Sequence, residues 1–156
     1  MANQNAETLR SLIHAFIRRF GLLDQTRTPC GLPLAVSDAH ALMELLQAPG
    51  IEQGELARRL GLSKSAVSRL MLRLEKKKLL RRAKNGEDRR AHNVRLTAKG
   101  GRMAARINRE SLARFGAILS RLPDGKSALL LECLPHLVQA VPDQVQAGRQ
   151  EGASDE

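Results

Sequence analysis

Hydrophobic and polar positions recur at helical spacing through most of the chain, and most clearly in the segment 54–79, GELARRLGLSKSAVSRLMLRLEKKKL. Its apolar residues at i, i+3, i+4 and i+7 predict a helix with one buried face; they are Val67, Leu70, Met71 and Leu74. Gly61 allows a sharp turn before this helix, and the Ser63 hydroxyl is placed to cap its N-terminus. The segment is therefore predicted to be a helix-turn-helix.

The opposite face of the second helix is predicted to point outward. It carries the hydrogen-bond donors Lys64, Ser65, Ser68, Arg69 and Arg73, without an opposing carboxylate face. Such a face suits a groove lined by phosphates and base acceptors, which favours binding to double-stranded DNA. An ordinary helical hairpin with a solvated basic face is the alternative interpretation.

The same periodicity predicts two helices before this segment. The first runs from Asn5 to near Gly21. A loop from Asp24 to Val36 follows, since it holds two prolines and a glycine. Ser37 is then expected to cap a helix that ends near Gln47.

A hairpin and two more helices are predicted after the segment. Residues 80–83 and 92–96 read as strands around the turn signal Asn85-Gly86. The hairpin tip carries Lys84, Arg89 and Arg90, which makes it a wing for the minor groove, or else a charged loop.

The long helix after the hairpin is expected to be capped by Thr97 and to reach about Leu122. A final helix reaches about Val141, with a kink or break at Pro135. The first and last helices expose wide apolar faces, which a partner subunit can cover.

The charge distribution supports an anionic partner. The 156-residue chain has a formal net charge of +10. Residues 37–100 hold 15 Lys or Arg against 7 Asp or Glu, which is net +8, and the remainder holds 11 against 9, which is net +2. Aromatic residues make up only 2%, so no stacking platform for single strands is expected. A non-specific architectural binder remains an alternative, although the hairpin lacks apolar wedge residues.

Other functional classes find little support. No nucleophile with a matched base, phosphate loop or metal-ligand spacing is present, so no catalytic site, metal or cofactor is predicted. The two cysteines, Cys30 and Cys133, form no CxxC pair, and no apolar run has the length of a membrane span. A soluble cytoplasmic protein with free thiols is expected.

The predicted helix-turn-helix and the hairpin after it together resemble the MarR family of bacterial transcription regulators. The resemblance rests on ELARRLGLSKSAVSRLMLRLEKKKLL and on Asp88-x-Arg90-x-x-x-Val94-x-Leu96-Thr97-x-x-Gly100. It implies a mainly α fold with a small β wing, a winged helix-turn-helix with flanking dimerisation helices. It implies an N-terminal dimerisation helix and loop at 1–36 and a DNA-binding domain at 37–100. C-terminal dimerisation helices at 101–145 and a mobile tail at 146–156 would follow.

The resemblance also implies a homodimeric repressor that binds a palindromic operator. Major-groove contacts would come from Ser63, Ser65, Ser68, Arg69 and Arg73. Arg89 or Arg90 would enter the minor groove, oriented by Asp88.

A small-molecule effector that releases the operator is typical of the family. The residues expected to line its pocket are His14, Arg18, His40 and Met43. Thiol-based sensing through Cys30 is an alternative, although the family's sensing Cys lies within the first helix. The chain departs from the family at Lys78, where a Gly is usual after the recognition helix, so either the helix ends differently or left-handed strain is tolerated.

Overall fold

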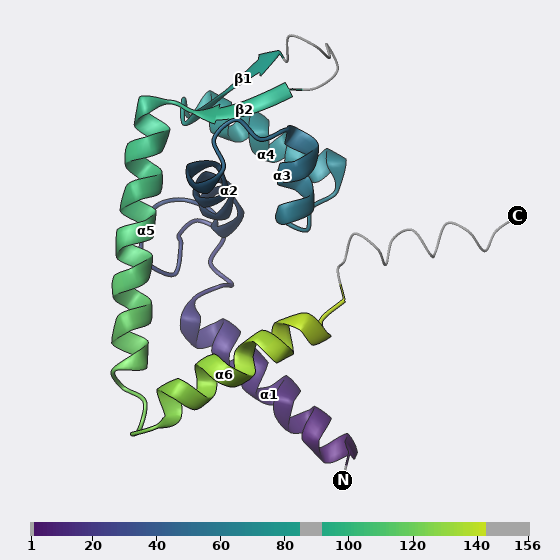
Figure 1. The fold of residues 1–156 in the computed structure, drawn as a ribbon, viewed down its shortest axis with the longest axis vertical. Helices are drawn as coiled ribbons and strands as arrows, with labels where there is room; N and C mark the ends of the chain where they lie inside the picture. Colours follow the sequence, from purple (N-terminus) through teal and green to yellow (C-terminus); the bar gives the residue numbers. More distant parts are fainter. Residues whose placement is uncertain (1, 85–91, 143–156) are drawn as a thin grey trace, which may run out of the picture.

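The computed structural model describes residues 2–84 and 92–142, which fold mainly into helices with one two-stranded antiparallel sheet, as predicted. The elements are α1 (Ala2–Phe20), α2 (Val36–Gln47), α3 (Gln53–Arg59), α4 (Lys64–Lys76), β1 (Leu80–Lys84), β2 (His92–Leu96), α5 (Ala98–Leu119) and α6 (Lys126–Ala140). Helices α2 to α4 and the hairpin form a lobe at one end of α5 (Figure 1). Helices α1 and α6 lie toward its other end.

The lobe contains the hydrophobic core. Its buried apolar side chains all lie between Leu32 and Ile107, and they include the predicted stripe of α4. Strand β2 is central, because Leu96 pairs with Leu80 of β1 on one side while Val94 N–H donates to the Ile51 carbonyl on the other. The core therefore fixes α4 and the hairpin as one unit.

The corner before α4 forms as predicted. Gly61 adopts a φ of 61°, and the Ala66 N–H donates to the Ser63 hydroxyl at 3.2 Å. Val67, Leu70, Met71 and Leu74 are all buried. The local signals for this helix-turn-helix are thus confirmed.

Several predicted boundaries are wrong. Ser37 does not cap α2, because the Ala39 N–H already bonds to the Ala35 carbonyl and places Ser37 inside the first turn. Helix α1 begins three residues earlier than expected, at Ala2. Helix α5 ends at Leu119, since Arg121 and Leu122 make tighter i→i+3 bonds. Pro135 lies inside α6, which continues to Ala140, so the helix is not broken there, and a kink at Pro135 stays a prediction.

The backbone at Lys78 shows which of the two expected endings of α4 the chain adopts. Within the described residues Lys78 is the only non-glycine residue with positive φ, at 58°. The Lys78 N–H bonds to the Glu75 carbonyl at 2.8 Å, and the Leu79 N–H bonds to the Leu74 carbonyl at 2.9 Å. This pair of bonds is the Schellman ending in which glycine is usual. The usual geometry is therefore kept, and the strain of a lysine is tolerated.

Replacing Lys78 by glycine is expected to raise the free energy of unfolding by about 1 kcal/mol, because only glycine removes the left-handed strain. Lys78→Ala removes the same charge but keeps the strain, so it should stay within about 0.5 kcal/mol of the wild type. Urea denaturation measures both. Equal stabilities of the two variants would refute a strained Lys78.

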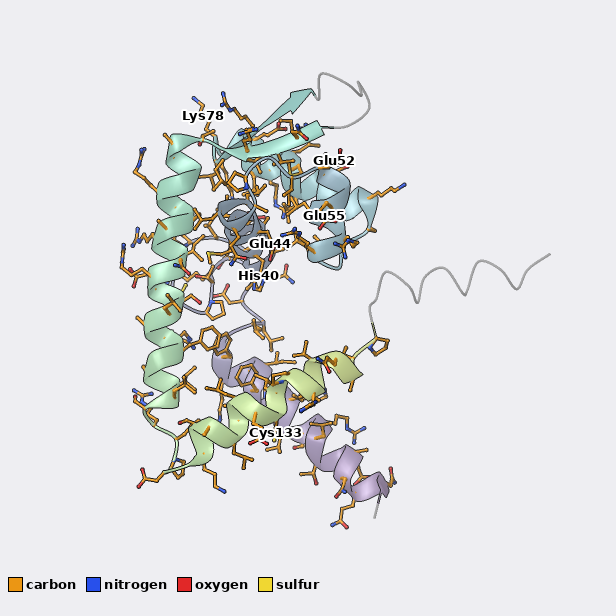
Figure 2. All side chains as sticks on the ribbon, viewed as in Figure 1. His40, Glu44, Glu52, Glu55, Lys78 and Cys133 are labelled. Atoms are coloured by element: carbon orange, nitrogen blue, oxygen red, sulfur yellow. The ribbon has the colours of Figure 1, made fainter. Side chains whose placement is uncertain are left out.

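The start of α5 packs against this same ending (Figure 2, Lys78). The Thr97 hydroxyl accepts from the Gly100 N–H at 3.0 Å, which confirms the predicted cap, and it donates to the Lys78 carbonyl at 2.8 Å. A Cβ on Gly100 would lie 1.7 Å from the Leu79 carbonyl oxygen. Glycine is therefore required where α5 crosses the end of α4.

The helices outside the lobe expose apolar side chains. Helix α6 buries none of its residues, and α1 contributes none to the core. The exposed large apolar residues of α1, α5 and α6 are Leu9, Leu12, Ile13, Phe16, Leu112, Phe115, Leu129, Leu130, Leu131, Leu134 and Val138. No helix in the described part of the chain is long and apolar enough to span a membrane.

Candidate nucleic-acid interface

The outward face of α4 carries polar and cationic side chains, as the periodicity predicts. Lys64, Ser65 and Arg69 are exposed, and Ser68 is half-buried. The Ser63 hydroxyl caps the helix and lies 3.1 Å from that of Ser65. Since the apolar stripe is anchored in the core, this face is held outward at one end of the molecule.

Gln53 fixes the position of Ser68. Its Nε2 donates to the Ser68 hydroxyl oxygen at 3.0 Å, from the first residue of α3. The Ser68 hydroxyl hydrogen is thereby left to donate to an acceptor of its own. Sequence reasoning missed Gln53, because this contact depends on how the two helices cross.

Asp38 fixes the last turns of α4 and is fully buried. Its carboxylate accepts from Arg73 Nη2 at 2.7 Å and from Lys77 Nζ at 3.0 Å. The two cations remain 47% and 44% exposed. The expectation that no carboxylate opposes the donor face is therefore wrong for Arg73, which binds α2 across the helix interface.

Further ion pairs attach β1 to α4 and form within α3. Arg82 of β1 donates to both carboxylate oxygens of Glu75, at 2.9 and 2.6 Å. On α3, hydrogen bonds from Arg58 and then from Arg59 lower the pKa of Glu55 to about 2. Glu55 is therefore ionised at neutral pH and pairs with both arginines on the surface of α3.

The wing strands agree with the prediction to within one residue, at Leu80–Lys84 and His92–Leu96. The turn Asn85-Gly86 and the residues Asp88, Arg89 and Arg90 lie outside the described residues. Their predicted minor-groove and orienting roles stay predictions.

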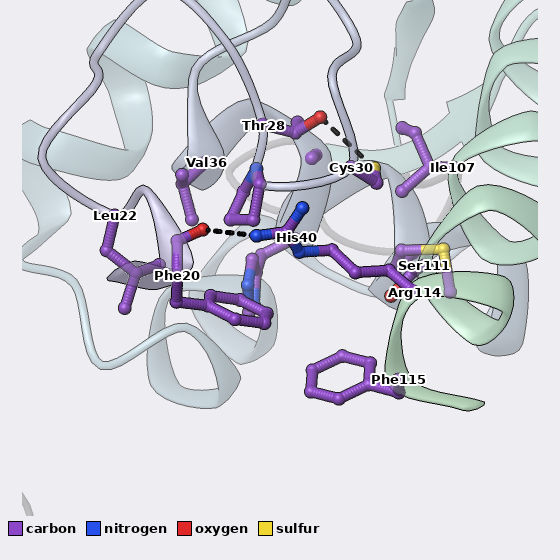
Figure 3. Close-up of a pocket in the computed structure, with 13 residues that line it drawn as sticks. Phe20, Leu22, Thr28, Cys30, Val36, His40, Ile107, Ser111, Arg114 and Phe115 are labelled. Atoms are coloured by element: carbon purple, nitrogen blue, oxygen red, sulfur yellow. Dashed lines mark hydrogen bonds between the residues drawn. The ribbon is translucent and has the colours of Figure 1, made fainter. Parts of the chain in front are cut away.

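A pocket of about 270 Å³ lies between the end of α1, the following loop, α2 and α5 (Figure 3). Two of the predicted ligand residues, His40 and Met43, line it. The other two, His14 and Arg18, are exposed on α1 and are not among its lining residues. The pocket separates the core lobe from the apolar ends of α1 and α5.

Arg114 is the cation of this pocket, and sequence reasoning missed it. Its Nη2 donates to the Phe20 carbonyl at 3.1 Å, and its guanidinium carbon lies 4.9 Å from the centre of the Phe20 ring. Its Nε is buried and has no hydrogen-bond partner among the residues that the structure describes. An unsatisfied cationic donor in an apolar cavity favours an anionic or acceptor group of a ligand.

Cys30 also lines the pocket. Its sulfur lies 3.1 Å from the Thr28 hydroxyl oxygen, and the residue is half-buried in the loop before α2. Cys133 lies exposed on α6. Redox sensing through Cys30 stays a prediction.

Comparison with known proteins identifies the segment that contains this interface. The family model described as the MarR family matches residues 31–91, which agrees with the resemblance found in the sequence. No curated protein matches the chain by sequence.

Solved structures share the fold over most of the chain. FabT of Streptococcus pneumoniae in complex with DNA has a TM-score of 0.69 at 20% identity, covering 89% of this chain and 96% of its own. S. aureus MepR bound to DNA has a TM-score of 0.68 at 21% identity, covering 88% and 98%. The regulator PcaV of Streptomyces coelicolor with its natural ligand has a TM-score of 0.66 at 22% identity, covering 89% and 94%.

Proposed function

Because its residues 31–91 belong to the MarR family of DNA-binding transcription regulators, we propose that this chain is a homodimeric repressor that binds a palindromic operator and is released by a small molecule. Members of the family are regulators and not enzymes. The observation that carries the proposal is the outward donor face of α4, which the core and three sets of polar contacts hold in place.

We place α4 in the major groove. Ser63, Lys64, Ser65, Ser68 and Arg69 would supply its contacts to phosphates and bases. Arg73 and Lys77 remain half-exposed at the Asp38 carboxylate and would reach a phosphate from there. The similar structures of FabT and MepR were solved in complex with DNA, which supports this docking by fold.

Replacing Arg69 by alanine is expected to weaken operator binding by about 1–3 kcal/mol and to relax base preference at one position, because an exposed arginine on this face reads base edges. Fluorescence anisotropy with labelled duplexes measures this change. Arg121→Ala is the matched control, since Arg121 is an exposed residue of the same charge that follows the last residue of α5, Leu119. An equal loss in both variants would assign the effect to net charge rather than docking.

We propose that α1, α6 and the end of α5 form the dimer interface. Their apolar side chains are exposed in the single chain, and α6 buries nothing. Burial of contiguous apolar surface drives association, and two-fold symmetry would present two recognition helices to the two halves of a palindrome. The division into terminal dimerisation segments and a DNA-binding segment at 37–100 follows from this assignment.

Sedimentation equilibrium is expected to give twice the chain mass of 17.2 kDa, about 34 kDa. The double variant Leu131→Glu, Leu134→Glu should shift the protein toward a monomer, because it places charge on the exposed apolar face of α6. Glu132→Gln is the control on the same helix and should leave the dimer intact. A monomer at micromolar concentration of the wild type would contradict this interface.

We place the effector in the pocket that holds His40, Met43 and Arg114. Its apolar walls and its unpaired cationic nitrogen suit a small molecule with a ring and one anionic group. The relative PcaV is described with its natural ligand. Helix α2 lines the pocket and also carries Asp38, so a ligand there would act on the helix that holds α4. Displacement of labelled duplex by small aromatic acids is the corresponding screen.

A further inference from the structure

Leu72 is a large apolar side chain that α4 leaves exposed. Its exposed fraction is 56%, whereas the other leucines of this helix, Leu70 and Leu74, are buried. It belongs neither to the core nor to the partly buried apolar residues packed against it. Water around such a side chain is unfavourable, so a partner surface that removes it gains free energy.

The helical register places Leu72 in the middle of the donor face. It follows Ser65 by seven residues, Ser68 by four and Arg69 by three, the spacings that put side chains on one side of a helix. Lys76 continues the same face four residues later and is exposed. The neighbours of Leu72 at these spacings are polar or cationic, and the one anion, Glu75, three residues after it, is bonded by Arg82.

The proposed dimer interface does not account for Leu72. The exposed apolar residues assigned to that interface lie on α1, α5 and α6, whereas α4 lies in the lobe at the hairpin end of α5 (Figure 1). A molecule that binds the donor face of α4 would therefore also cover Leu72.

We propose that Leu72 contacts the C5-methyl group of a thymine in the major groove and so selects a T·A pair at one position of each half-site. The inference rests on the proposed docking of α4. The thymine methyl is the apolar group that bases present in the major groove, and it distinguishes thymine from cytosine. Leucine supplies no hydrogen bond, so its contribution to sequence preference is through this contact.

The position along the helix separates this contact from the one made by Ser65. Seven residues of an α-helix span about 10 Å. That length corresponds to about three base-pair steps of 3.4 Å along a DNA strand. Leu72 would thus read a base pair different from the one that faces the N-terminal turn of α4.

The test uses a duplex chosen by the wild-type protein from a random library, with each thymine in turn replaced by deoxyuridine, which lacks only the methyl group. Wild-type affinity should fall about fourfold at one thymine per half-site, the effect of burying roughly one methyl group. Leu72→Ala should bind the thymine duplex more weakly and show no further loss with uracil there. Leu23→Ala is the control, because Leu23 is an equally large exposed leucine outside α4.

Two results would overturn the inference while leaving the proposed function in place. One is a wild-type affinity that no uracil replacement changes, and the other is the same uracil loss in Leu72→Ala as in the wild type. Unchanged thermal midpoints of the variants would exclude misfolding as the cause. Absence of any sequence-selective duplex binding by the wild type would instead contradict the proposed function itself.

Discussion

Replacing Gly100 by alanine is expected to destabilise the protein by about 3 kcal/mol, at the upper end of the effect of overpacking. The added Cβ would lie 1.7 Å from the Leu79 carbonyl oxygen and 2.8 Å from its carbonyl carbon. Backbone atoms do not rotate away as a side chain does, so α5 or the end of α4 has to move. The same movement would strain the bonds from Thr97 to the Lys78 and Leu79 carbonyls.

Gly101→Ala provides a control of the same chemistry one residue away. Beyond the adjacent residues and the backbone of its own helix, no atom of the described residues lies within 4 Å of a Cβ built at Gly101, which is also in the first turns of α5. Alanine is therefore expected to stabilise the helix there by up to about 1 kcal/mol. Urea denaturation of both variants separates close packing from helix propensity. Opposite signs are expected, and a stabilised Gly100→Ala would refute the contact between α5 and Leu79.

Replacing Asp38 by asparagine is expected to lower the free energy of unfolding by about 2 kcal/mol. The carboxylate accepts from both Arg73 and Lys77, whereas an amide has one oxygen and presents an NH₂ group to the other cation. Loss of one partner from a buried ion pair usually lowers the free energy of unfolding by more than this, about 3–5 kcal/mol. The expected value is smaller here because both cations are about half-exposed and can be solvated.

The same substitution should reduce the ratio of operator affinity to random-duplex affinity. Arg73 and Lys77 would lose their fixed positions but keep their charges, so binding to phosphates would persist while the orientation of α4 is lost. Asp124→Asn makes the same charge change at an exposed residue between α5 and α6 and should leave both quantities unchanged. An unaltered affinity ratio in Asp38→Asn would show that Asp38 does not position α4.

The elements that could be predicted from sequence are those specified by local chemistry. Gly61 and the Ser63 cap define the corner before α4, and the apolar spacing defines its buried side. The wing strands follow from two short runs around Asn-Gly. These signals act within one turn or hairpin, so they do not depend on the rest of the fold.

The features that escaped prediction depend on distant parts of the chain. Asp38 binds Arg73 and Lys77, which lie 35 and 39 residues further along the chain. The apolar and polar pattern of α2 does not indicate that the Asp38 carboxylate is buried. Arg114 meets Phe20 across 94 residues.

Lys78 shows a different limit of sequence reasoning. A lysine disfavours the left-handed backbone that ends α4, yet Lys78 adopts it. The start of α5 supports this ending, because the Thr97 hydroxyl donates to the Lys78 carbonyl. Here tertiary packing prevails over the local preference of one residue, since the strain is on the order of 1 kcal/mol.

Selection from a library of random duplexes, followed by titration of the enriched sequence at several salt concentrations, tests the central claim most directly. We predict enrichment of a palindrome whose half-sites are centred about one helical turn apart, and an affinity that falls steeply with salt as phosphate contacts release counterions. The enriched duplex should bind at least about a thousandfold more tightly than random sequence. Equal affinity for enriched and random duplexes would contradict a sequence-specific regulator.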